Sequence, residues 1–338
     1  MTAVLDSPAA SRAADRTLTF TAVVCAYTLD RWDDIVAAVE SLHAQTHRPD
    51  EIVLVSDHNP ELLERARAAF PAVRSVASTG TRGLSDARNT GVAVATGDIV
   101  GFLDDDAAAD PRWVERMLAA YEDDDVLGVG GAVVPAWRGP RPVWFPDEFL
   151  WVVGCSYTGL PTGRAEVRNP IGANMSFRRR VLTAAGGFDA GLGRLGRDAA
   201  GCEETEFSIR ARAAHPGGRV VFEPTALCRH NVSVDRLSRT YFRRRCQAEG
   251  RSKALVAGLA GADAALSSER AYVSRTLPAG VLRGLRGGLT GDPSAAARAW
   301  TIVEGLALTG AAYALASVRQ RLRAVTGRFR RATGGATA

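Results

Sequence analysis

Short apolar runs alternate with helix-like stretches along the first part of the chain. Residues 18–27, 51–56 and 72–77 are rich in aliphatic side chains, which predicts three strands. After Asp30, apolar residues recur every three or four positions, and Pro60 is well placed as the first residue of a second helix. Because strands and helices alternate, the pattern predicts a parallel sheet with right-handed crossovers, and therefore an α/β fold.

The segment 83–106 is the most informative part of this pattern. A helix of small residues is expected over 86–95, followed by a turn. The apolar run 99–103 then leads directly into three carboxylates, Asp104, Asp105 and Asp106. A fully apolar strand is typical of a parallel sheet buried on both faces, and its carboxyl end opens into the crevice where such sheets bind ligands. Alternate aspartates at that position can hold a hard divalent cation.

The rest of the chain continues the alternation less regularly. Further strands are expected at 127–134, 169–178 and 219–224, and further helices at 112–121, 179–185 and 208–214. The acidic run 123–125 is interpreted as a solvated turn after a helix. The Gly-rich segment 191–201 is expected to be mobile and is a candidate lid over the site.

Composition narrows the class of protein. A chain of 338 residues with 46% hydrophobic side chains can form one large α/β domain with an appendage, or two domains. Residues 1–16 lack the apolar core of a signal peptide and are expected to be a disordered tail. The five cysteines are scattered without a CxxC pair, which predicts reduced thiols and a cytoplasmic protein.

The C-terminal region, 231–338, is predicted to be helical and separate from a catalytic domain over 17–230. Its basic excess is uneven, because no acid follows Glu304 whereas six arginines do. The stretch 300–318 is apolar, but it contains Glu304 and two glycines, so a membrane span is not expected. Apolar residues at spacings of three and four between 308 and 329 form a basic amphipathic pattern. That pattern suits either an anionic membrane surface or packing on the catalytic domain, and we favour an interfacial role.

The acidic strand end and its surroundings resemble a known family. The segment Ala87-Arg88-Asn89, the apolar strand and the Asp104-x-Asp106 pair are similar to the core of family 2 glycosyltransferases, and the resemblance extends over 20–253. It implies a GT-A fold, which is a Rossmann-like sandwich with a mostly parallel central sheet. It also implies a nucleotide-sugar donor, most simply a UDP-sugar, and Mg²⁺ or Mn²⁺ as cofactor.

The resemblance assigns residues to the donor and metal sites. It implies that Asp104, Asp106 and His230 lie at the metal, although a lone His such as His230 is more often structural. Nucleotide and donor contacts are expected from several parts of the chain: Ala26, Tyr27, Arg31, Asp57, Arg88, Asp104, Asp105, Asn174, Arg245 and Arg251. Asp57 could instead begin a turn, and the basic stretch containing Arg245 and Arg251 could be a solvated helix face. The family's Gln-x-x-Arg-Trp motif is absent there.

The catalytic base is expected in the acidic segment 203–206. Glu204 takes the place of the family's catalytic acid, with Glu where Asp is usual, and Glu203 is expected on the acceptor side. Without the resemblance, these acids would be read only as favouring a helix N-terminus. Trp151, with Trp144 and Phe145, either lines an acceptor cleft or covers the sheet. A single base predicts a direct displacement with inversion.

The expected reaction is transfer to a hydroxyl or phosphate of a glycan, lipid-linked or small-molecule acceptor, in cell-surface glycan or lipid-linked saccharide synthesis. The location is expected to be cytoplasmic, with peripheral contact at the inner face of the cell membrane, and oligomers are not excluded. Alternatives are a natural-product glycosyltransferase or a non-catalytic nucleotide-sugar-binding protein of the same fold. A nucleotidyltransferase is disfavoured because the Gly-rich loop after the first strand is missing. Nucleic acid is not expected as a partner, because the basic tail lacks interleaved aromatic residues.

Overall fold

The computed structural model describes residues 17–192 and 201–334, with side chains of the last helix described as far as Leu322. The predicted tail and most of the predicted lid lie outside these residues. The strands are β1 Phe20–Ala26, β2 Glu51–Ser56, β3 Arg74–Ala77, β4 Ile99–Asp104, β5 Ala107–Ala109, β6 Val126–Trp137, β7 Ala165–Val167, β8 Asn174–Arg178 and β9 Arg219–Val232. The α-helices are α1 Trp32–His43, α2 Pro60–Ala69, α3 Leu84–Val94, α4 Trp113–Ala119, α5 Arg179–Ala184, α6 Glu203–Ala214, α7 Arg239–Ala260, α8 Ala262–Ala265, α9 Ser267–Ala271, α10 Leu277–Leu289 and α11 Pro293–Gly334. Short 3-10 helices, η1 Leu29–Arg31, η2 Asp147–Val153 and η3 Val234–Leu237, and the π-helix η4 Tyr272–Thr276 complete them.

The strands form one sheet in the order β3-β2-β1-β4-β8-β6-β9-β5, with β7 paired to β9. The first four strands of this order are parallel, as the alternation of strands and helices predicted. Strand β8 enters antiparallel between β4 and β6, and β9 then runs parallel to β6. The α/β fold with a mostly parallel central sheet is therefore confirmed.

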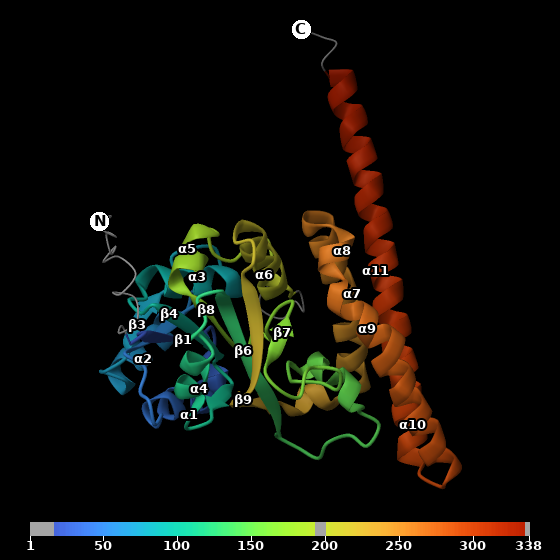
Figure 1. Cartoon of the computed structure of the whole chain (residues 1–338), viewed down its shortest axis with the longest axis horizontal. Helices are drawn as coiled ribbons and strands as arrows, with labels where there is room; N and C mark the ends of the chain where they lie inside the picture. The colour runs from blue at the N-terminus through green and yellow to red at the C-terminus, as the bar shows by residue number, and fades with distance from the viewer. Residues whose placement is uncertain (1–16, 193–200, 335–338) are drawn as a thin grey trace, which may run out of the picture.

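Helices cover both faces of the sheet (Figure 1). Alternate residues of β1 point to opposite sides: Ala22 and Val24 pack with α1, α2 and α4, whereas Val23 packs with α3, α5 and α6. Both faces are thus buried, which explains why the central strands are apolar without alternation.

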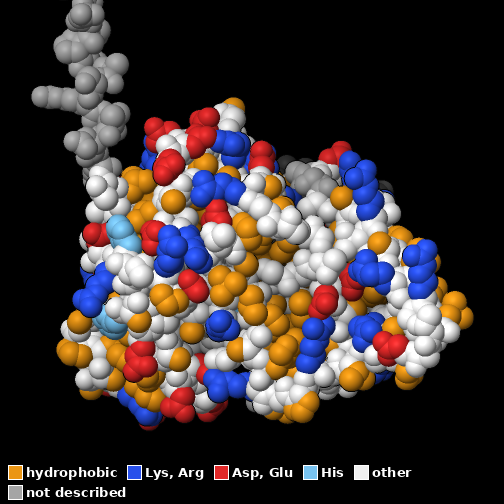
Figure 2. All heavy atoms as spheres, turned by 60° about the horizontal axis from the view of Figure 1, so that its bottom comes forward, with side chains coloured by type: hydrophobic (Ala, Val, Ile, Leu, Met, Phe, Trp, Pro, Cys, Tyr) orange, Lys and Arg blue, Asp and Glu red, His pale blue; other side chains and the backbone are white. Residues whose placement is uncertain are grey.

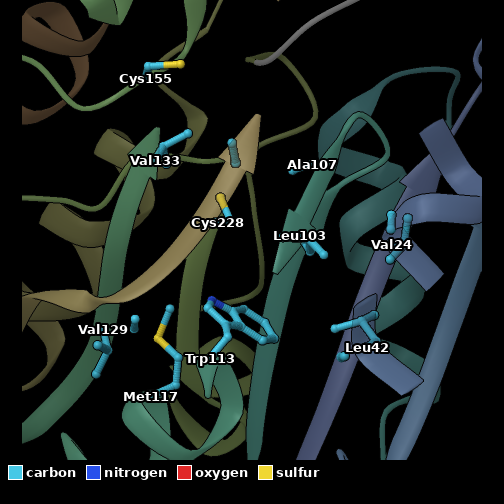
Figure 3. Packing of buried hydrophobic residues seen from close by; sticks show 14 of the residues in the cluster. Val24, Leu42, Leu103, Ala107, Trp113, Met117, Val129, Val133, Cys155 and Cys228 are labelled. Atoms are coloured by element: carbon cyan, nitrogen blue, oxygen red, sulfur yellow. The ribbon is translucent and has the colours of Figure 1, made fainter. Parts of the chain in front are cut away.

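Trp113 of α4 lies at the centre of one core (Figure 3). Its ring meets Phe20 edge to face at 5.4 Å, and its Nε1 donates a hydrogen bond to Oδ1 of Asn174 at 2.7 Å. The Asn174 amide donates to the carbonyls of Ala132 and Ala226 at 2.8 and 2.9 Å. Asn174 is fully buried, so its amide joins β8 to the strands β6 and β9 beside it.

The C-terminal helices pack on the layers around the sheet and on each other. Phe242 of α7 lies in the same core cluster as β1 and contacts Phe145 and Phe149. Of the two uses expected for Phe145, lining an acceptor cleft or covering the sheet, this arrangement favours the second. The long helix α11 runs along α7 and α10 at the edge of the molecule (Figure 1). Helices α7 and α11 approach closely at Gly250 of α7, where an added Cβ would lie 2.3 Å from the carbonyl oxygen of Thr309 in α11.

Several details differ from the predicted elements. Strands β5 and β7 were not predicted, and β9 continues to Val232. Strand β6 continues through Pro135 to Trp137, because its residues pair with β9, so the predicted loop starts later. Helix α6 begins at Glu203, which places the acidic residues in its first turn.

On the face turned to the viewer in Figure 2, acidic, basic and hydrophobic side chains are interspersed rather than gathered by sign.

Candidate functional site

The acidic residues meet where β4 ends. Asp104 is the last residue of β4 and lies beside Cys25 of β1, so the carboxyl ends of the two strands coincide. The chain then turns at Asp105 and Asp106 into β5, which pairs antiparallel with β9 and brings Ala107 opposite His230. Pairing between segments far apart in sequence therefore places a histidine beside the aspartates.

Asp104, Asp106 and His230 form a group whose potential ligand atoms all lie within 4.8 Å of one another. His230 Nε2 lies 3.0 Å from Asp106 Oδ1, and both side chains are almost fully buried. Asp104 is more accessible, with 25% of its side chain exposed, and so opens the group toward solvent. Two carboxylates and one imidazole are a donor set that suits Mn²⁺, so these residues fit the metal that the family resemblance implies.

Two arginines approach the same aspartates. Arg31 Nη1 lies 2.9 Å from Asp105 Oδ1 and 3.2 Å from Asp106 Oδ2, and Arg236 Nη2 lies 3.2 Å from that Asp106 oxygen. Burial favours the neutral acid, but His230, Arg236 and Arg31 together hold the pKa of Asp106 well below its ordinary value. Burial and the charge of Asp106 instead raise the pKa of Asp105 to about 7.

Arg236 was not identified from the sequence. It stands in the short helix η3 after β9, outside any motif, and only the fold brings it to Asp106. No signal in the local sequence marks it.

The Arg88 guanidinium joins the aspartates to helix α6. Its Nη1 lies 2.6 Å from Glu203 Oε1, and its Nη2 lies 3.4 Å from Asp104 Oδ1 and donates to the Gly172 carbonyl at 3.0 Å. The Arg88 side chain is only 2% exposed. The predicted metal residues and the predicted base segment are therefore separated by a single buried side chain.

Glu204 lies in the first turn of α6, next to Glu203, and is partly exposed. Burial and the charge of Glu203 raise its pKa to about 7. The third acid of the segment, Glu206, differs because it forms an ion pair with Arg210 at 2.7 Å. Glu204 thus combines partial access with a pKa suited to accepting a proton near neutrality.

Residues expected around the nucleotide gather at the ends of β1 and β2. The Asp57 amide donates to the Ala26 carbonyl at 2.8 Å, and Asp57 Oδ2 accepts from the Gly83 amide at 3.0 Å. The Arg31 guanidinium lies 5.4 Å from the centre of the Tyr27 ring. Arg31 thereby connects this corner to the aspartates.

Other predicted contacts lie differently. The Asn174 amide is committed to three protein partners, and this geometry does not suit the predicted contact with sugar hydroxyls. Trp151 is half-buried against Phe149, and its Nε1 donates to the Tyr272 hydroxyl at 3.1 Å. Arg251 is exposed on α7, whereas Arg245 is buried near Glu249 on the same helix. Helix α7 lies beside α6, and the Cys202 thiol at the start of α6 is 3.8 Å from Glu249 Oε1 of α7.

Two cavities of the described chain lie away from Asp104, Asp106 and Glu204. One, of about 560 Å³, is bounded by Arg168, Ile209 and Arg219 behind α6. The other, of about 210 Å³, is bounded by Arg48, Glu51 and Arg74 at the opposite ends of the strands.

Comparisons with known proteins agree with this arrangement. The sequence model described as Glycosyl transferase family 2 matches residues 21–185. A glucosyl-dolichyl phosphate glucuronosyltransferase of Haloferax volcanii is 38% identical over 214 residues, which span 62% of this chain and 68% of the relative.

Two solved structures share the fold. A mannosyltransferase of Pyrobaculum calidifontis in complex with GDP-Man and Mn²⁺ has a TM-score of 0.56 at 18% identity, covering 90% of this chain and 88% of that one. GalNAc-T7 with UDP, GalNAc and Mn²⁺ has a TM-score of 0.50 at 18% identity, covering 69% of this chain and 48% of that one. Sequence, fold and relatives together show that the chain belongs to the family 2 glycosyltransferases and has the GT-A fold.

Proposed function

We propose that this glycosyltransferase moves a sugar, with inversion, from a UDP-sugar to a hydroxyl or phosphate of a lipid-linked saccharide, with Mn²⁺ or Mg²⁺ as cofactor. The observation that carries the proposal is the Arg88 bridge, which holds Asp104 and Glu203 on one guanidinium. A metal-binding group and a candidate base on opposite sides of the molecule could not share one reaction.

The part of the site that binds the nucleotide-sugar donor is assigned to residues at the carboxyl ends of the strands. The positions of Tyr27 and Asp57, directly after β1 and β2, support a nucleoside site there, because the Asp57 carboxylate can accept hydrogen bonds from ribose hydroxyls or base amides. Asp104, Asp106 and His230 would hold the divalent cation, which when bound neutralises charge on the leaving nucleoside diphosphate. Arg31 and Arg236 are guanidinium donors at the same place, and guanidinium groups match phosphate oxygens well.

Glu204 is assigned as the general base. It removes the proton from the acceptor hydroxyl as that oxygen attacks the anomeric carbon from the face opposite the leaving group. Its raised pKa supports this role, because a base with a pKa near the working pH is ionised yet still binds a proton well. Glu203 is held by Arg88 and orients the turn that carries Glu204.

The relatives support the substrate classes. The 38% identical relative is named for a glucosyl-dolichyl phosphate acceptor, which supports a lipid-linked acceptor. A lipid-linked acceptor in turn fits our proposal that the enzyme works at the inner face of the cell membrane. One structural neighbour holds UDP and the other GDP-Man, so the nucleobase is to be tested with both.

The Glu204→Gln variant tests the proposal. It should lower kcat by at least about 10²-fold while leaving the Kd for UDP and Mn²⁺ unchanged, since only proton removal is lost. Glu206→Gln is the matched control, because Glu206 occupies the same turn but is paired with Arg210, and it should keep transfer. Full activity of Glu204→Gln would remove Glu204 from the role. Absence of any donor turnover by the unmodified chain, including hydrolysis to free sugar, would favour a binding protein instead.

A further inference from the structure

Helix α11 presents an apolar face that the rest of the described chain leaves uncovered. Every exposed residue of α11 from Ala296 to Val318 is Ala, Gly, Trp, Val or Leu. At a rise of about 1.5 Å per residue, this face is about 33 Å long. Its large side chains, with their exposed fractions, are Trp300 66%, Val303 46%, Leu306 37%, Leu315 53%, Val318 52% and Leu322 61%.

The opposite face of α11 is fixed to the protein. Glu304 forms ion pairs with Arg243 at 2.6 Å and Arg239 at 3.4 Å, both on α7. Ile302 is buried in the core shared with the catalytic domain. The close approach at Gly250 leaves no room for another helix or for lipid between α7 and α11. One face of α11 therefore packs on the rest of the protein, and the opposite face is left for the other use predicted for this segment, contact with a membrane surface.

Length and composition alone would allow the segment Pro293–Leu322 to cross a membrane. That arrangement would expose α7 to lipid or break the Glu304 ion pairs, and charged groups are costly in hydrocarbon. Only 17% of the most apolar 18-residue stretch of this segment is buried inside the protein, so the segment is not the core helix of a soluble domain either. An amphipathic helix lying in the membrane surface fits both facts.

Charge identifies the partner. Arg319 and Arg321 are exposed where the apolar face ends, and residues 305–338 contain six arginines and no acid. A second copy of the chain would bring like charges together if the helices paired in parallel. An anionic lipid surface instead offers hydrocarbon for the apolar residues and negative headgroups for the arginines.

We infer that the outer face of α11, defined by Trp300, Val303, Leu306, Leu315, Val318 and Leu322, docks on an anionic lipid bilayer without crossing it. The inference deepens the proposed location of the enzyme at a membrane. Lipid binding is measured without donor or acceptor, so it succeeds or fails independently of the proposed reaction.

Co-sedimentation of the full chain with vesicles tests the inference. Vesicles of phosphatidylcholine mixed with phosphatidylglycerol should bind the chain, and vesicles of phosphatidylcholine alone should bind it at least about tenfold less, because each arginine near an anionic surface strengthens binding roughly fivefold. Added salt should weaken binding through screening. Trp300 fluorescence should shift to shorter wavelength on binding, as the indole leaves water.

Variants locate the surface. Leu315→Ser/Val318→Ser should reduce binding to anionic vesicles by at least about tenfold, from the lost burial of two aliphatic side chains. Val143→Ser, at a valine outside α11 that is 68% exposed, should not. Arg319→Glu/Arg321→Glu should reduce binding to anionic vesicles only. Thermal melting should be unchanged in all three, because the substituted side chains are exposed.

Three results would overturn the inference: equal binding of the double Ser variant and the unmodified chain, equal binding to neutral and anionic vesicles, or protection of the segment after Leu322 from added protease by sealed vesicles but not by detergent-opened ones, as a crossing helix requires. A dimer in light scattering that the double Ser variant abolishes, without vesicle binding by the unmodified chain, would assign the face to self-association instead.

Discussion

Replacing Arg88 by methionine tests whether the metal group and helix α6 are held as one site. Arg88 is 2% exposed and Glu203 is 5% exposed, and their charged atoms are 2.6 Å apart. Burial opposes the charged guanidinium, but Glu203 and Asp104 more than offset it and raise the pKa of Arg88. Methionine has a similar length and fills most of the space, so the main effect is loss of the cation.

The expected magnitude follows from the buried carboxylate that remains. Removing one partner of a buried ion pair costs about 3–5 kcal/mol, because the other charge is left uncompensated. Urea unfolding followed by tryptophan fluorescence measures this loss. Arg67→Met is the control, since Arg67 and Glu64 form an exposed pair, and it should cost less than about 1 kcal/mol.

A double-mutant cycle with Glu203→Gln makes the test specific. If the pair is direct, the double variant should recover about 1–3 kcal/mol relative to the sum of the single losses. Additive losses, or an Arg88→Met cost no larger than that of Arg67→Met, would refute the reasoning that one guanidinium holds the two halves of the site.

Four further predictions concern the pH dependence of activity and of stability, metal binding and helix packing. Because the pKa of Glu204 is raised to about 7, kcat/KM at saturating Mn²⁺ should rise about tenfold per pH unit below pH 7 and then level off; a flat profile would contradict the base assignment. The same shift means that folded Glu204 keeps a proton that the unfolded chain has lost, so its contribution to stability should fall as pH rises from 4.5 to about 7. EDTA should abolish transfer and Mn²⁺ should restore it, and His230→Ala should weaken Mn²⁺ binding in calorimetry, whereas His215→Ala at the end of α6 should not. Gly250→Ala should lower the free energy of unfolding by about 1–3 kcal/mol by forcing α7 from α11, whereas Gly163→Ala, with nothing within 4 Å of the added carbon, should be nearly neutral; equal melting temperatures would show that the helices are not in contact.

Local patterns in the sequence were enough for most of the elements and for the first aspartates, but not for strands β5 and β7 or for the second half of β9, which carries His230. The apolar run before Asp104 encodes a buried strand whatever its neighbours, and strand–helix alternation then requires parallel pairing in β1 to β4. The acidic strand end was sufficient to predict a metal site there. The amphipathic pattern within α11 was also visible, because helical periodicity needs no knowledge of the fold.

Only the tertiary structure decided which side chains meet. Arg88 and Glu203 are 115 residues apart, and Arg236 and Asp106 are 130 apart, so no local spacing relates them. Asn174 looked like a ligand in a strand next to the site, yet the pleat turns its amide inward to three protein partners. The physical reason is that periodicity fixes which face of an element is apolar, whereas strand order, register and helix packing determine what each polar side chain on that element faces.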